Sequence, residues 1–144
     1  MQLKYSTPAG SDGKLATNGI HDATLHAIDF VSGVHFNVCL RDEDGQDKWF
    51  CFEEVAQLSA QGVVAGLIVC DLFAWKIGPS IQPTGRMEEG WHVLLGEGYS
   101  EEKFQLEVGR LARRYSGLRL ALIEGANGGS IALVCRDILT EDEA

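Results

Sequence analysis

The chain has few cysteines, few basic residues and no long apolar run. Its four cysteines lie far apart: Cys39, Cys51, Cys70 and Cys135. No two of them have the CxxC spacing of zinc knuckles and thioredoxin-like motifs, which argues against both. Because each lies within an apolar segment, we expect reduced, buried thiols.

Basic residues are outnumbered by acidic ones. Twelve Lys and Arg stand against 21 Asp and Glu, so the formal net charge is -9. A nucleic-acid binder is disfavoured, because neutralising phosphates requires a basic face. The most apolar run, residues 63–75, is too short to span a bilayer and contains Asp71. The opening Met1–Ser6 lacks the apolar segment of a secretory signal, so we expect a soluble, cytoplasmic protein.

Familiar catalytic and ion-binding motifs are also missing. No G-x-S-x-G pentapeptide is present, which disfavours a serine hydrolase of that type. An EF-hand loop counted from Asp42 would need glycine at its sixth position, where Asp47 stands instead. The glycine-rich residues 126–130 have no nearby lysine, so a hairpin turn that uses Asn127-Gly128 explains them better than a phosphate loop. We therefore predict no metal and no cofactor.

Length and composition fit one globular domain. The chain has 144 residues, of which 45% are hydrophobic and 23% charged, and this is enough to bury a core. Residues 1–19 are rich in Ser, Thr, Gly, Pro and Asn, which predicts an irregular N-terminal arm. Residues 20–144 are then expected to form the domain.

Alternation of apolar and polar residues predicts antiparallel sheet. In residues 34–41, apolar residues alternate with polar ones or cysteine. An acidic turn over residues 42–47 leads into an aromatic strand at 48–52. Further strands are predicted at these positions: 20–30, 63–73, 91–95, 118–123 and 131–135. Residues 77–86, with two prolines, are predicted to be a loop.

One helix is predicted near residues 101–115. Ser100 can cap its N-terminus, acidic residues begin it, and Arg113 and Arg114 end it before Gly117. The alternation of Phe104, Leu106 and Val108 leaves a strand as the alternative. The predicted fold is therefore α+β, mostly antiparallel β, either a sandwich or a curved sheet, with this one helix.

Two groups of polar residues are candidate sites. The first is the acidic turn, which could bind a basic partner: Asp42, Glu43, Asp44 and Asp47. The second would line a pocket: His21, Asp22, His35 and Asp71. Imidazoles beside carboxylates suit acid–base chemistry, and a buried Asp71 would have a raised pKa. The alternative is that Asp71 has no role in a site and either faces solvent at a strand edge or pairs with Arg119 or Arg136.

Three stretches also resemble a group of known proteins. They are His21-Asp22-Ala23-x-Leu25-x-x-Ile28, Phe52-x-x-Val55-x-x-Leu58 and Gly128-Gly129-Ser130-Ile131-x-x-x-Cys135-x-x-Ile138. The pattern is similar to small uncharacterised bacterial β-rich proteins, some of which are filed as immunity proteins of polymorphic toxin systems. The resemblance implies a bacterial protein with a non-enzymatic, protein-binding role and no catalytic residues.

The sequence therefore leads to two hypotheses of function. The favoured one is a non-catalytic protein-interaction module, either an immunity-type inhibitor or an assembly subunit, that meets a basic protein through its acidic surface. The alternative is a small-ligand-binding or enzymatic domain with a pocket at the second group of residues. A pocket with perturbed titration would support the alternative. Homodimerisation through a sheet edge is a further alternative.

Overall fold

Strands rich in apolar residues build most of the structure. The computed structural model describes residues 3–5, 13–15, 20–32, 35–64, 66–78, 82–114 and 116–141. The strands of this part of the chain are β1 (Leu3–Tyr5), β2 (Ala23–Ser32), β3 (His35–Arg41), β4 (Asp47–Glu53), β5 (Gln57–Gln61), β6 (Ile68–Lys76), β7 (Arg119–Gly125), β8 (Ser130–Cys135) and β9 (Asp137–Glu141). Two helices, α1 (Arg86–Leu95) and α2 (Glu101–Arg114), complete an α+β protein that is mostly β, as predicted.

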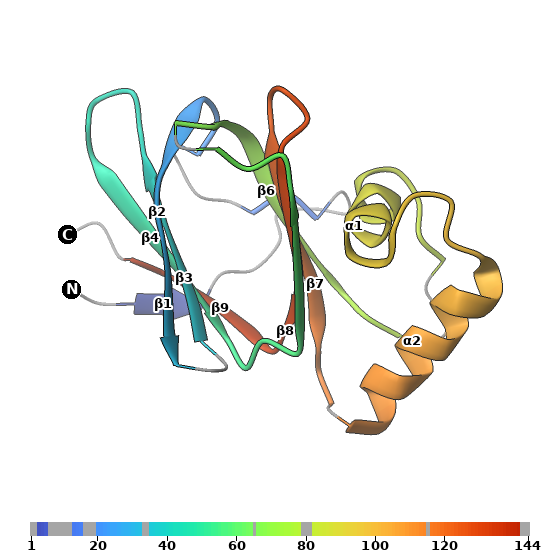
Figure 1. Ribbon diagram of the computed structural model, residues 1–144. Helices are drawn as coiled ribbons and strands as arrows, with labels where there is room; N and C mark the ends of the chain where they lie inside the picture. The colour runs from blue at the N-terminus through green and yellow to red at the C-terminus, as the bar shows by residue number, and fades with distance from the viewer. Residues whose placement is uncertain are drawn as a thin grey trace.

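All the strands belong to one antiparallel sheet that is not closed. Its order is β1-β9-β4-β3-β2-β6-β7-β8-β5. The predicted hairpin is present as β3 and β4, with Val38 opposite Phe50. Only Arg136 separates β8 from β9, yet β8 pairs with β7 and β9 pairs with β4. The sheet is therefore strongly curved, and its two halves face each other (Figure 1).

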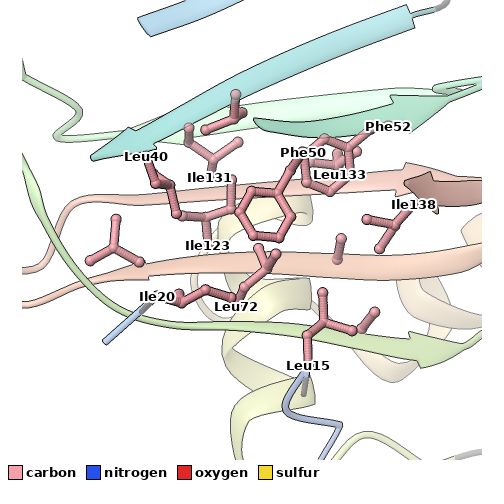
Figure 2. Packing of buried hydrophobic residues seen from close by; sticks show 14 of the residues in the cluster. Leu15, Ile20, Leu40, Phe50, Phe52, Leu72, Ile123, Ile131, Leu133 and Ile138 are labelled. Carbon is pink, nitrogen blue, oxygen red and sulfur yellow. The ribbon is translucent and has the colours of Figure 1, made fainter. Parts of the chain in front are cut away.

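The main core fills the space between the two halves of the sheet. Leu40, Phe50 and Phe52 from one half meet Leu72 and Ile123 from the other, all with 1% exposure or less (Figure 2). Removing apolar side chains from water is the dominant favourable term in folding. This inner core explains why the sheet curves instead of lying flat.

A second core lies on the outer face of β6, β7 and β8. Leu122 and Val134 point into it, whereas their neighbours Ile123 and Leu133 point into the inner core. Both faces of these strands are therefore covered, which accounts for their nearly continuous apolar sequence. The helices lie on this side of the sheet, α1 close to β7 and α2 farther out (Figure 1).

The predicted helix is confirmed as α2. The Ser100 hydroxyl accepts a hydrogen bond of 3.0 Å from the Lys103 amide, as an N-cap does. Phe104, Val108 and Leu111 are buried at helical spacing, whereas Leu106 is 63% exposed. The strand alternative, which would place Leu106 on the same face as Phe104, is thereby excluded.

Helix α1 was not predicted, and the strand expected at residues 91–95 is wrong. The apolar run there is helical because Trp91, Leu94 and Leu95 fall on one buried face. Gly90 allows the helix to approach the sheet, since a Cβ atom there would lie 3.0 Å from Leu120 Cδ2. Acidic residues in the first turn, Glu88 and Glu89, suit the positive end of the helix dipole.

Part of the expected N-terminal arm joins the sheet. Leu3–Tyr5 form β1 against β9, and Lys14 makes a bridge to Phe73 in β6. These pairings join residues far apart in sequence, so local composition does not reveal them. Gly13 and Leu15 are also described, and the remaining residues of 1–19 lie outside the described residues.

The expectation of buried thiols holds for only two of the four cysteines, since Cys51 and Cys70 are partly exposed. All four are free thiols, and Cys39 and Cys135 are buried. Burial raises the pKa of Cys135 to about 12, so its thiol is protonated at neutral pH. In the described chain, neither helix has the length and apolar character needed to cross a bilayer.

Candidate functional site

A cavity of about 610 Å³ opens between α1 and the turn that joins β7 to β8. Side chains from α1 form one wall, and strand ends and the turn form the other. Its polar and charged lining side chains are Gln61, Cys70, Arg86, Glu89, His92, Glu97, Glu124 and Ser130. Because these residues come from several segments, only the folded chain creates the site.

A cluster of three ionisable side chains lies in the wall of this cavity. Arg86 Nη1 is 2.8 Å from Glu124 Oε2 and 3.0 Å from both carboxylate oxygens of Glu89. The contact with Glu124 is an ion pair without hydrogen-bond alignment, so Glu124 Oε2 remains a buried acceptor with no hydrogen bond among the described residues. The guanidinium therefore links α1 to β7.

The environment of Glu124 favours its protonated form. Its side chain is only 15% exposed, and burial, followed by the adjacent Glu89 carboxyl, raises the pKa of Glu124 above its usual range. Arg86 opposes this rise but does not cancel it. Hydrogen bonding to Glu89, followed by the charge of Glu124, raises the pKa of Arg86, which stays positive. This cluster thus holds two carboxyl groups and one cation.

His92 adds a second polar group without a partner. Its Nδ1 atom is buried and has no hydrogen bond within the described residues. Its Nε2 atom lies 3.5 Å from Glu88 Oε1, and its ring contacts Tyr99 with centroids 4.9 Å apart. Buried polar atoms usually have a partner, so this nitrogen is an exception among the described residues.

Cys70 lines the cavity but is not an activated nucleophile. Burial, together with the negative charges of Glu124, Asp71 and Asp22, raises the pKa of its thiol. A catalytic cysteine needs the opposite environment, in which nearby positive charge favours the thiolate. Covalent catalysis by this thiol is therefore disfavoured.

The β7–β8 turn approaches the cavity through its backbone. Gly128 has a φ of 88°, which glycine adopts readily, as expected for the predicted Asn-Gly turn. A Cβ atom on Gly125 would collide with the carbonyl oxygen of Gly129, so only glycine fits there without a backbone shift. The backbone of this turn therefore forms one wall of the cavity.

Three of the four residues predicted to line a pocket lie close together. His21 Nε2 is 3.7 Å from Asp22 Oδ2, and His21 Nδ1 is 4.0 Å from Asp71 Oδ2. Asp71 also lies 3.4 Å from Lys14 Nζ. Its ion-pair partner is therefore this lysine, where the sequence suggested Arg119 or Arg136. His35 lies opposite Ser32 at the far end of β2, about 30 Å along the strand from Asp22.

This group borders the cavity without lining it. His21 and Asp22 are exposed, at 69% and 54% of their side chains. Asp71 is the β-sheet register partner of Glu124, and its negative charge contributes to the raised pKa of Glu124. The sequence therefore indicated the neighbourhood of the cavity through Asp71 but not the residues that line it.

The acids of the β3–β4 turn divide into two pairs. Asp42 accepts hydrogen bonds of 3.0 and 2.9 Å from the amides of Asp44 and Gln46, which shapes the turn. Asp47 binds Arg41 at 2.8 Å, and this hydrogen bond lowers the pKa of Asp47. The Glu43 and Asp44 side chains are exposed at the tip of the turn.

Sequence reasoning missed four residues that line the cavity: Arg86, Glu89, His92 and Glu124. Arg86 and Glu89 lie three residues apart, and this spacing would have indicated a pair if a helix had been expected there. In the part of the chain that the structure describes, no three His, Cys, Asp or Glu side chains gather as a metal site would require. No family model matches the chain, and no curated protein or solved structure is significantly similar to it.

Proposed function

We propose that the protein binds a small polar ligand carrying a positively charged group in the cavity beside α1. The observation that carries this proposal is the Arg86, Glu89 and Glu124 cluster, which lies partly buried in the wall. The volume of about 610 Å³ is typical of small-molecule sites, which range from about 300 to 1,000 Å³. A carboxyl group with a raised pKa in such a cleft supports a binding role.

A cation is the ligand charge that the lining favours. Three carboxyl groups, those of Glu89, Glu97 and Glu124, line the cavity with one guanidinium, whose charge Glu89 and Glu124 already share. A bound ammonium group would supply the positive charge that a proton otherwise brings to Glu89 and Glu124. It could also donate a hydrogen bond to His92 Nδ1. An anion would instead compete with the carboxylates for Arg86, so we expect it to bind weakly.

Binding without covalent chemistry is the activity that we propose. The protonated state of Cys70 favours this proposal over nucleophilic catalysis. The carboxyl pair could still exchange a proton with a ligand, which would make binding depend on pH. Because a cation stabilises the ionised carboxylate, its affinity should rise as the pH increases through the raised pKa of Glu124.

Calorimetric titration with putrescine, ethanolamine and citrate tests the proposal. We expect an amine to bind and citrate not to bind. Replacing Glu89→Gln should weaken amine binding by about tenfold, the effect of one lost charge-assisted contact. The matched control Glu102→Gln makes the same change on an exposed position of α2 and should leave binding unchanged. Equal losses in the two variants, or tighter binding of citrate, would contradict the proposal.

The interaction role remains a second proposal. The exposed Glu43 and Asp44 favour it, because they form an acidic tip that could meet a basic protein. Asp42 and Asp47, engaged within the turn region, would then position that tip. An immunity-type inhibitor is one form that this role could take. In a lysate pull-down, the double change Glu43→Lys and Asp44→Lys should abolish capture of a basic protein; retained capture would argue against this surface.

A further inference from the structure

The second half of β2 has an edge without a partner strand. β2 pairs with β6 only at Ala23 and Thr24, and backbone hydrogen bonds continue only to Leu25. Beyond that point β2 still pairs with β3, as far as Ser32. Among the described residues, no strand pairs with the other side of residues 27–32. The backbone amide and carbonyl groups on that side can therefore pair with another chain.

Apolar side chains of the core face are exposed along this edge. Ile28 lies opposite Val38 and Phe30 opposite Phe36, and both partners are buried in the inner core. The Phe30 ring lies 5.0 Å from that of Phe36, yet Phe30 is 65% exposed and Ile28 40%. Apolar surface beside the inner core is therefore exposed to solvent where β2 has no neighbour.

A groove of about 230 Å³ begins beside the same edge. It is lined by the residues Leu25, His26, Ala27, Ile28, Val63 and Val64. Val64 is 62% exposed and adds apolar surface to the groove. An extended segment paired with residues 27–32 could place alternate side chains over Ile28 and Phe30. The end of the same segment could then lie in this groove.

We propose that this edge binds an extended segment of another protein that alternates apolar with basic residues. The apolar positions would cover Ile28 and Phe30. The basic positions would face Asp29, which is exposed on the opposite side of the strand, level with Asn37. Opposite charges on neighbouring strands stabilise a sheet, and the net charge of -9 favours a basic partner.

A second copy of this chain is a poorer fit to the same edge. Pairing β2 with itself would bring two Asp29 carboxylates close together, between two molecules of net charge -9 each. Lys and Arg are absent from β2, so it could not supply the basic positions. Charge therefore favours a basic segment of another protein over a second copy of this chain.

Selection from a phage library of random twelve-residue peptides tests the proposal. The library would be selected on the wild-type protein, and enriched peptides would be synthesised and measured by fluorescence anisotropy. We expect sequences that alternate apolar with Lys or Arg. Asp29→Lys should weaken their binding by at least about tenfold, whereas Glu102→Lys on α2, with the same change of net charge, should leave it nearly unchanged. Circular dichroism would establish that both variants are folded.

Two further measurements locate the binding. Hydrogen exchange should slow at residues 27–32 when peptide is added, and a peptide N-methylated at alternate residues should lose binding, because it lacks the amide donors of a paired strand. A selection that yields no peptide, or binding that Asp29→Lys and N-methylation both leave intact, would overturn the proposal. Protection of residues 27–32 without peptide, together with a dimer in size-exclusion chromatography, would identify a second copy as the occupant.

Discussion

Truncation of two large residues on α2 should have very different effects on stability. Phe104 is 2% exposed and packs edge-on against Trp91, with ring centroids 5.2 Å apart, whereas Leu106 on the same helix is 63% exposed. We expect Phe104→Ala to destabilise the protein strongly and Leu106→Ala to change its stability very little. The comparison tests whether α2 is a helix that packs through a single face.

The expected magnitudes follow from burial. A buried Phe→Ala change costs about 4 kcal/mol in free energy of unfolding, because apolar contacts are lost and a cavity remains. An exposed Leu→Ala change in a helix should stay within about 0.5 kcal/mol. For a chain of 144 residues the unfolding entropy is about 0.3 kcal/mol/K, so the melting temperature should fall by about 13 °C for Phe104→Ala.

Thermal and urea unfolding followed by circular dichroism at 222 nm would measure these differences. This signal reports backbone structure and avoids Trp91, whose fluorescence would change on loss of its aromatic neighbour. Equal destabilisation by the two variants would refute the reasoning, since it would place Phe104 and Leu106 on the same buried face. That result would fit the strand alternative for this segment.

Two further predictions concern the cavity. Because the pKa of Glu124 is raised above 4.5, its value for an unperturbed carboxyl, the folded state holds a proton more tightly than the unfolded state. The wild type should therefore lose stability relative to Glu124→Gln as the pH rises from 4.5, by at most about 1.4 kcal/mol per pH unit; a pH-independent difference in urea midpoints would contradict this. Gly125→Ala should cost more than about 2 kcal/mol, because its Cβ would meet the Gly129 backbone, whereas Gly45→Ala, strained at a φ of 79° but in open space, should cost about 1 kcal/mol in the same assay.

The candidate site illustrates what local patterns miss. Arg86 lay at the end of a predicted loop, and His92 lay within a predicted strand. Neither assignment brings the two side chains together. Glu124 comes from a hairpin almost forty residues farther along the chain. Only the approach of α1 to β7, which Gly90 permits against Leu120, brings these side chains to one cavity.

The sequence by itself determined the α+β class, the β3–β4 hairpin, the Asn-Gly turn and the second helix. Each depends on residues close together in the chain: alternation along a strand, a glycine in a turn, or Ser100 at the start of a helix. Interactions between residues so close in sequence favour the same local structure whatever the rest of the chain does.

Tertiary structure alone decided the curvature of the sheet, the helical state of residues 86–95, the cavity and the open edge of β2. An apolar run such as Trp91–Leu95 suits a strand or a helix, and the surface that it must cover selects between them. The raised pKa of Glu124 likewise depends on burial and on Glu89, which comes from another segment. These properties arise from contacts between residues far apart in the chain, so patterns within a short stretch of sequence do not predict them.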